Sequence, residues 1–193
     1  MLKKVGQGWQ FASENNLEDF VWGQLNSLFE ISPLKRQYTA YGDICDILAV
    51  DKNSRLVIME LKNVEDRYIV QQLTRYYHSL LEEKPFQEQV NYQLPVRLIA
   101  VAPSFHRHNW LDRKYHKLSF EFMSFTLRQL ENEVYLHLTD LNTKKVSQAK
   151  IIDVSIFKKA KPSQVSDTIV TTASGGITFT KSLDDMLRYS NPK

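Results

Sequence analysis

The chain has few of the residues that hold small secreted proteins together. It contains one cysteine, Cys45, among 193 residues, so no disulfide can form within the chain. This favours a reducing compartment, and we expect a cytoplasmic protein. Met1-Leu2-Lys3-Lys4 leads into polar residues instead of a signal-peptide core, and no apolar run is long enough to span a bilayer.

Two further absences limit the reactions that this protein is expected to catalyse. No glycine-rich phosphate loop occurs, and no serine or histidine lies in a nucleophile-elbow context, which argues against nucleotide-dependent phosphoryl transfer and acyl transfer. Five histidines are present, but without a cysteine-rich pattern they make a poor zinc site. A net charge of +3 is compatible with nucleic-acid binding without requiring it.

Against this background, two apolar runs stand out because each contains an acidic residue. Ile44–Val50 and Leu56–Lys62 read as two strands of a hairpin, with Asp51–Ser54 as the turn. Strand alternation places Asp46 on one face with Ile44 and Leu48. A buried carboxylate is costly unless it is paired or bound to a metal. Asp46 and Glu60 are therefore expected to converge, with Lys62 beside them.

This group has the composition of a hard-cation site. Mg²⁺ is commonly held by one or two carboxylates together with substrate phosphate. A neighbouring lysine can orient a water molecule and balance charge on a phosphoryl oxygen. The residues thus suggest hydrolysis of a phosphodiester. A purely structural ion pair between Lys62 and Asp46 or Glu60 is the simpler alternative.

Asp46 followed after thirteen residues by Glu60-Leu61-Lys62 resembles the motif of the PD-(D/E)XK nuclease superfamily, and its RecB-like and NucS-like members in particular. Gly42 to Leu48 resembles their glycine-led strand, Gln72 to Tyr76 their Q-x-x-x-Y helix, and Leu17 to Phe20 their acidic first helix. The likeness extends over roughly Ser13 to Phe125, with several motifs in the right order.

The resemblance implies a role for each matching residue. Asp46 and Glu60 would bind Mg²⁺, with Mn²⁺ as a substitute, and Leu61 would offer its carbonyl oxygen. Lys62 would orient the attacking water, while Glu18 and Gln72 assist. The implied function is a metal-dependent nuclease acting on nucleic acid, with DNA favoured. Cleavage of both strands of a duplex would suit a homodimer. The alternative is a nucleic-acid-binding or scaffold protein with the same fold and no turnover.

The fold implied is α/β, with a restriction-endonuclease-like core in which helices flank a central mixed sheet. Residues 1–157 would form the nuclease-like domain and residues 158–193 a C-terminal appendage, either a hairpin with a short helix or a mobile tail. Hydrophobic periodicity predicts helices and strands along the domain. Helices are expected over Leu17–Glu30 with Asn16 as N-cap, Tyr68–Leu81 and Asn109–Tyr115. Strands are expected over Leu34–Ala40, Val96–Ala102, Leu118–Leu127, Glu133–Leu141 and Val146–Val154.

Two basic segments leave their roles open. Lys35-Arg36-Gln37 could meet a phosphate or form a solvated strand edge. Arg107 to Lys117 combines basic and aromatic residues, and either tracks a phosphate backbone or is an ordinary wet helix face.

Overall fold

The computed structural model describes residues 1–152 of the chain. The predicted domain boundary after residue 157 and the predicted appendage lie outside the described residues. The elements, in chain order, are β1 (Leu2–Val5), β2 (Gly8–Phe11), α1 (Glu14–Trp22), α2 (Leu25–Phe29), β3 (Ile31–Ala40), β4 (Asp43–Asp51), β5 (Leu56–Leu61), α3 (Ile69–Glu83), β6 (Arg97–Ala102), α4 (Arg107–Tyr115), β7 (Phe120–Leu130), β8 (Glu133–Asp140) and β9 (Val146–Ile151).

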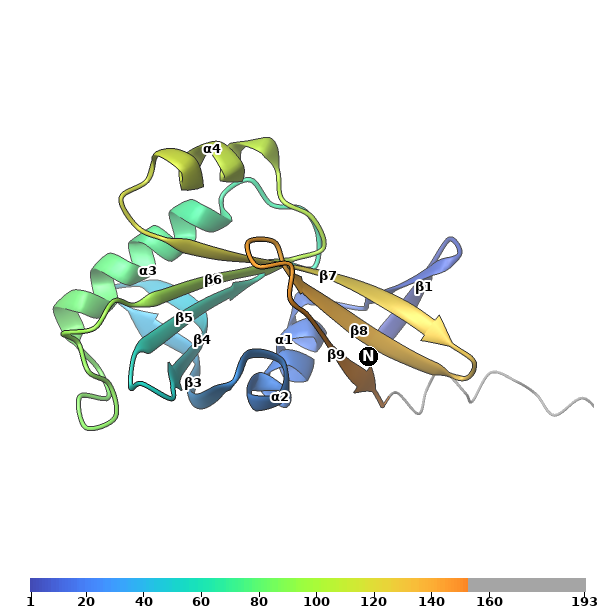
Figure 1. Ribbon diagram of the computed structural model, residues 1–193, viewed down its shortest axis with the longest axis horizontal. Coiled ribbons are helices and arrows are strands. Elements are labelled where there is room, and N and C mark those ends of the chain that lie inside the picture. Colours follow the sequence, from blue (N-terminus) through green and yellow to red (C-terminus); the bar gives the residue numbers. More distant parts are fainter. Residues whose placement is uncertain (153–193) are drawn as a thin grey trace, which may run out of the picture. The chain divides into compact units, whose positions relative to one another are not determined.

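A mixed seven-stranded sheet forms the centre of the described part, in the order β3-β4-β5-β6-β7-β8-β9 (Figure 1). Strands β5, β6 and β7 are parallel, and the other neighbours are antiparallel. The predicted α/β class with a central mixed sheet is confirmed. The predicted parallel pairing of β5 and β6 across α3 is also confirmed, as a βαβ unit.

Hydrophobic side chains on the two faces of the sheet form two cores. Along β5, Val57, Met59 and Leu61 join one cluster, whereas Leu56 and Ile58 join the other. The first cluster packs under α1 and α2, and the second under α3, as the two sides of the sheet in Figure 1 show. All six residues of β5 are buried. A strand covered on both faces explains the nearly continuous apolar run in the sequence.

The first helix differs from its prediction. Ser13 is the N-cap, with its side-chain oxygen accepting a hydrogen bond from the Asn16 N–H, so the predicted Asn16 cap is wrong. The predicted single helix is two helices, because α1 ends at Trp22 with Gly23 as its C-cap and α2 begins at Leu25. The remaining predicted helices and strands are present within a few residues of their expected ends, except that the predicted end of the last strand, Val154, lies outside the described residues.

The N-terminal residues form an element that the sequence did not reveal. Strands β1 and β2 pair as a separate antiparallel hairpin, and Phe11 is fully buried against Phe20 and Phe125. Among the described residues, no helix has the length and apolar character needed to cross a membrane.

Candidate active site

Asp46 and Glu60 meet where β4 separates from β5. The antiparallel ladder between these strands ends at the pair Ile47 and Met59, one position before the two acids would face each other. At that point the Asp46 side chain takes the place of a backbone acceptor of the ladder. Its Oδ2 accepts a hydrogen bond of 2.8 Å from the Leu61 N–H. The predicted convergence of the two carboxylates therefore occurs, and a backbone amide holds one of them.

Strict alternation along β4 fails at the same place. Ile47 and Ala49 belong to the core under α1, but Cys45 and Leu48 both belong to the core under α3. Cys45 and Ile47 would share a face in a regular strand. The prediction that Asp46 and Leu48 lie on the same face of the strand assumed regular alternation, and β4 does not alternate regularly here. Gln37, on the neighbouring strand, has a φ of 47°, so the distortion extends into β3.

Lys62 lies directly after β5 and is the third charged residue of the site. Its N–H donates to the Val101 carbonyl at 2.8 Å, which fixes the backbone at the end of the strand. Its ammonium Nζ lies 2.7 Å from Glu60 Oε1 and 3.4 Å from Glu14 Oε1. The simple ion pair between Lys62 and Glu60 is thus present in the structure.

That ion pair leaves part of Glu60 unsatisfied. Glu60 is 1% exposed, yet its second oxygen, Oε2, is buried without a hydrogen-bond partner in the described structure. An uncompensated buried carboxylate oxygen is expensive. This oxygen is therefore available to a cation. What sets it apart from Asp112 Oδ2, which is also buried without a partner, is its position beside the charges of Asp46 and Lys62.

The pKa values of Asp46 and Glu60 also show that Lys62 alone does not compensate their negative charges. Burial, together with the charge of Asp46, raises the pKa of Glu60 to about 8 even though Lys62 opposes the shift. Burial raises the pKa of Asp46 to about 6, against the lowering effects of the Leu61 N–H and Lys62. One ammonium does not neutralise two close carboxylates, so the pair retains a proton that a bound cation would displace.

Lys62 itself stays charged. Burial lowers the pKa of its ammonium, but the charges of Glu60, Glu14 and Asp46 outweigh burial and raise that pKa above its ordinary value. Lys62 is therefore a proton donor and a positive charge at neutral pH, and not a free amine ready to accept a proton.

Glu18 has different partners from those its predicted role requires. It is buried, and its two oxygens accept hydrogen bonds from Arg36 Nε at 2.8 Å and Gln37 Nε2 at 2.5 Å. Arg36 also contacts Asp19. Arg36 and Gln37 thus contact acids of α1. Strand β3 is an edge strand in which Lys35 and Gln37 are exposed, so the structure supports the solvated edge of the two alternatives. A role for Glu18 near a metal stays a prediction.

Glu14, at the start of α1, is the acid that sequence reasoning missed. It contacts Lys62 through Oε1, and its Oε2 accepts a hydrogen bond of 3.3 Å from the Asn63 N–H. Ser13 was the signal that could have found it. A serine followed by an acidic residue is typical of a helix start. Had the first helix been predicted to begin at Glu14 instead of Leu17, Glu14 would have been placed in its first turn, toward the end of β5.

Gln72 lies in the first half of α3, and its side chain makes no hydrogen bond among the described residues. Its neighbour one turn on, Tyr76, is buried, and the nearby Glu60 charge adds to burial in raising the pKa of its hydroxyl. The Q-x-x-x-Y helix therefore lies beside the acids, with Tyr76 in the predicted core position. A direct role for Gln72 stays a prediction.

No three histidine, cysteine, aspartate or glutamate side chains in residues 1–152 form a group that could hold a metal ion by themselves. Two carboxylates and a carbonyl remain compatible with Mg²⁺, which normally takes further ligands from water and substrate phosphate. The unpartnered Glu60 Oε2 and the raised pKa values of both acids fit such a cation.

The basic residues of α4 are partly engaged. Arg113 contacts Asn142 and lies over the rings of Trp110 and Phe122, and His116 accepts a hydrogen bond from the Leu118 N–H. These contacts are structural, and they leave the choice between a phosphate track and a wet helix face open for the remaining residues.

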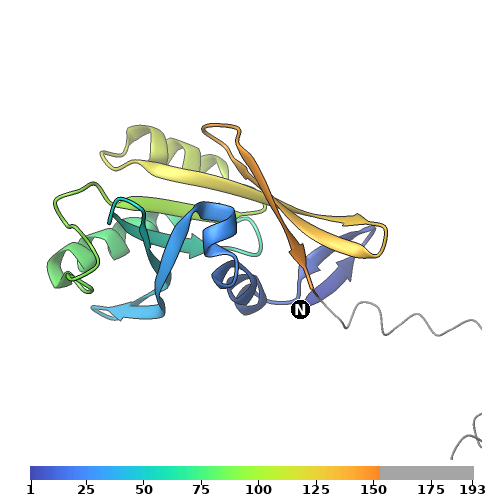
Figure 2. The ribbon, with the colours of Figure 1, turned by 60° about the horizontal axis from the view of Figure 1, so that its bottom comes forward.

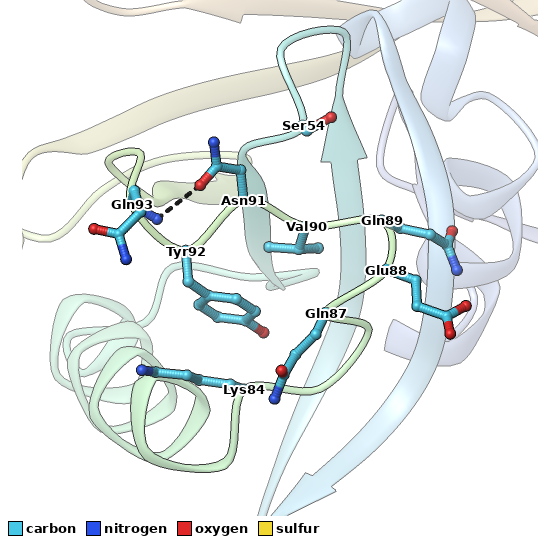
Figure 3. A pocket seen from close by; sticks show the side chains of 9 residues that line it. All are labelled: Ser54, Lys84, Gln87, Glu88, Gln89, Val90, Asn91, Tyr92 and Gln93. Atoms are coloured by element: carbon cyan, nitrogen blue, oxygen red, sulfur yellow. Dashed lines mark hydrogen bonds between the residues drawn. The ribbon is translucent and has the colours of Figure 1, made fainter.

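A separate hollow lies at the other end of the β4–β5 hairpin. Figure 3 shows this pocket of about 470 Å³, lined by the segment 87–93 together with Lys84 and Ser54. Four of its nine lining residues carry carboxamides, and Asn91 Oδ1 accepts a hydrogen bond from the Gln93 N–H. Ser54 belongs to the turn after β4, whereas Asp46 lies near the start of that strand. The pocket is therefore not part of the acid–lysine site.

Comparison with known proteins agrees with this geometry. A family model described as the endonuclease NucS C-terminal domain matches residues 13–121, more than half of the chain, and this range contains Asp46, Glu60 and Lys62. The chain belongs to the NucS C-terminal domain family. The resemblance to NucS-like PD-(D/E)XK nucleases is thereby confirmed.

Two curated relatives of this NucS-family chain are both described as Endonuclease NucS. The protein from Pyrococcus abyssi (strain GE5 / Orsay) is 40% identical over 73 residues, which are 37% of this chain and 26% of the relative. The protein from Pyrococcus horikoshii is 35% identical over 94 residues, which are 48% of this chain and 34% of the relative. The chain thus spans about a third or less of the length of these relatives.

Solved structures of NucS-type proteins are partly similar. A repair endonuclease from Pyrococcus abyssi has a TM-score of 0.44 and 25% identity, over 61% of this chain and 47% of that one. EndoMS in a complex with double-stranded DNA has a TM-score of 0.46 and 22% identity, over 63% of this chain and 47% of that one.

We expect Glu14→Gln to lower the cleavage rate by about tenfold, less than the loss expected for removing a donor that touches the substrate. Glu14 contacts Lys62; if its role is to position that ammonium without touching a reacting group, affinity for substrate in Ca²⁺ should not change. Single-turnover kinetics and binding on the same DNA measure the two effects.

Asp19→Asn is the matched control on the same helix. Asp19 is an exposed acid that pairs with Arg36 Nη2, so its loss should change thermal stability little and leave the single-turnover rate near that of the unmodified protein. If Asp19→Asn slowed cleavage as much as Glu14→Gln did, the effect would come from the charge of the helix and not from the contact of Glu14 with Lys62.

Proposed function

We propose that this chain is the nuclease domain of a divalent-metal-dependent phosphodiesterase, acting as a DNA endonuclease. The observation that carries the proposal is the meeting of Asp46, Glu60 and Lys62 at the end of β5, with one oxygen of Glu60 buried and unpaired. The relatives described as Endonuclease NucS, and the EndoMS complex with double-stranded DNA, support DNA as the substrate.

Asp46 and Glu60 would hold Mg²⁺, with Mn²⁺ as a substitute, and the Leu61 carbonyl would lie beside them. The cation would supply positive charge against the carboxylates and the phosphate and lower the pKa of a coordinated water. The amide of Leu61 keeps Asp46 in place before substrate arrives. The site is therefore organised in advance, apart from the charge that the cation brings.

Lys62 supplies the remaining chemistry. Its ammonium, held by Glu60 and Glu14, can donate to the attacking water and to a phosphoryl oxygen that gains charge in the transition state. The burial of Glu60 and the partial burial of Lys62 reduce competition from solvent. Orientation and charge stabilisation by residues already fixed in the fold are sufficient roles for these side chains.

Cleavage of both strands of a duplex requires two such sites, which a homodimer related by a two-fold axis would provide. We include a homodimer and a cytoplasmic location in the proposal. The alternative function, a nucleic-acid-binding scaffold without turnover, retains the fold but gives no reason to bury an unpaired carboxylate oxygen beside a second acid.

A cleavage assay tests the proposal. Labelled single-stranded, duplex and branched DNA, and the matching RNA, should be incubated with the protein in Mg²⁺, Mn²⁺ or chelator. We expect internal cuts in DNA with either cation and none in chelator. Binding of DNA without cleavage of any form in either cation would favour the scaffold.

A further inference from the structure

Asn63 follows Lys62 directly and joins the end of β5 to the N-terminal segment of the chain. Its Nδ2 donates a hydrogen bond of 2.8 Å to the carbonyl of Phe11, the last residue of β2. Its carbonyl accepts a hydrogen bond of 3.1 Å from Gln10 Nε2. Its N–H donates to Glu14 Oε2 at 3.3 Å. One residue therefore contacts both the hairpin β1–β2 and the start of α1.

The side chain of Asn63 contributes one specific contact. Asn63 is 8% exposed, and its Oδ1 has no hydrogen-bond partner among the described residues. The bond from Nδ2 to the Phe11 carbonyl is thus the one that this side chain makes in the described structure. The Phe11 ring is fully buried against Phe20 and Phe125, so its carbonyl is a fixed point to which Asn63 can attach.

The segment that Asn63 holds leads directly to Glu14. Only Ala12 and Ser13 separate Phe11 from Glu14, and Ser13 is the N-cap of α1. Figure 2 shows the dark-blue hairpin between α1 and the turn that joins β7 to β8. Glu14 Oε1 lies 3.4 Å from Lys62 Nζ. Because such bonds are normally about 2.7–3.2 Å long, a small further shift of the segment would break this contact.

We propose that Asn63 is a positioning residue for Lys62, which holds the Phe11 carbonyl and thereby places Glu14 against the Lys62 ammonium. The inference rests on the proposed function, because the position of Lys62 affects catalysis only if the site cleaves its substrate. The ammonium contacts two carboxylates, Glu60 at 2.7 Å and Glu14. Glu60 precedes Lys62 by two residues, whereas Glu14 comes from a distant segment, so Glu14 is the carboxylate that needs an anchor.

Asn63→Ala should lower the single-turnover rate in Mg²⁺ about tenfold, like Glu14→Gln, because a group near the reaction is displaced. Affinity for DNA in Ca²⁺ should not change. The double variant should be no slower than the slower single variant, since both changes remove the same contact. Mass spectrometry after reductive methylation of the metal-free protein should show faster modification of Lys62 in both single variants. The Lys62 side chain is 14% exposed, and each variant removes one of the two carboxylates that hold it.

Gln129→Ala is the matched control. It removes the acceptor of the Trp9 indole N–H, 3.0 Å away, and so loosens the hairpin β1–β2 without touching Asn63. Its cleavage rate and its methylation of Lys62 should equal those of the unmodified protein. Gln10→Ala is the second test if Asn63→Ala does not fold. It removes the hydrogen bond to the Asn63 carbonyl, and it should slow cleavage about threefold and speed the methylation of Lys62.

The outcomes separate this inference from the proposed function. If the unmodified protein cleaved no DNA, the proposed function would fail, and unchanged methylation of Lys62 in Asn63→Ala would still overturn the placement. If the protein cleaved DNA and Asn63→Ala cleaved it equally fast, Asn63 would have no positioning role. Equal slowing by Gln129→Ala would overturn the inference in favour of a general loosening of the hairpin. Losses that multiply in the double variant would show that Asn63 does not act through Glu14.

Discussion

Glu60→Gln is expected to abolish cleavage and, in chelator, to raise the melting temperature of the protein by a few degrees. Asp46→Asn should also abolish cleavage. In the proposed site both acids hold the cation, so the rate should fall to background with either variant. Thermal unfolding in chelator and in Mg²⁺, beside the cleavage assay, measures both effects.

The stability increase follows from the repulsion between the acids. Folding raises the pKa of Glu60 from its ordinary 4.5 to about 8, so the folded state favours the protonated form. That contribution to stability is complete below about pH 4.5 and is lost as the pH rises toward 8. The uncharged glutamine has no such loss. The difference in melting temperature between Glu60→Gln and the unmodified protein should therefore widen from pH 5 to pH 9 in chelator.

Saturating Mg²⁺ should make the melting temperature of the unmodified protein higher than that of Glu60→Gln. A cation that binds only the folded, unmodified protein stabilises it in proportion to the logarithm of the cation concentration. Glu60→Gln, which binds the cation weakly, should gain little. The melting temperatures of the two proteins should therefore cross as Mg²⁺ is added at pH 8.

Glu121→Gln provides a contrast from elsewhere in the sheet. Glu121 accepts two hydrogen bonds from Arg97, at 2.8 and 2.7 Å, in an ion pair without an unsatisfied oxygen. Its loss should lower stability equally with and without Mg²⁺ and leave cleavage intact. If Glu60→Gln behaved like Glu121→Gln, with a large loss of stability in chelator, the pair between Glu60 and Lys62 would be structural and the metal site would be wrong.

The parts of the fold that could be predicted are those with strong local signals. Strand β5 is an apolar run interrupted by Glu60, and α3 has a clear buried stripe that includes Leu73 and Leu80. The parallel pairing of β5 with β6 follows from the strand–helix–strand order, because such crossovers join parallel strands. These elements placed Glu60 and Lys62 correctly.

The parts that were missed depend on contacts between distant segments. Ser13 marks Glu14 as the first residue of α1, but local patterning does not show that Glu14 contacts Lys62, because that contact depends on where α1 crosses the end of β5. The alternation of side chains along β4 breaks at Asp46 because its side chain, in place of a backbone carbonyl, accepts the hydrogen bond from the Leu61 N–H. Hairpin β1–β2 is too short and polar to signal itself, and Phe11 secures it only by tertiary packing.

Lys62→Ala is expected to lower the cleavage rate by about 10²- to 10³-fold, the scale seen when one preorganised donor is removed. In the proposed mechanism the ammonium acts where charge develops on the phosphoryl oxygens, so its loss should appear in the rate and hardly at all in ground-state binding. Single-turnover rates in Mg²⁺, and affinities in Ca²⁺ over a range of salt concentrations, measure the two quantities on one substrate.

Lys62→Arg helps to separate position from charge. It keeps the positive charge, but a planar guanidinium cannot take the place of an ammonium that lies 2.7 Å from Glu60 and 3.4 Å from Glu14. If position matters, Lys62→Arg should remain slow while binding DNA like the unmodified protein. If Lys62 were one more phosphate-binding cation, Lys62→Arg would restore activity, and Lys62→Ala would weaken affinity and reduce the salt slope by about one unit. Cleavage by Lys62→Ala at the unmodified rate would remove Lys62 from the mechanism.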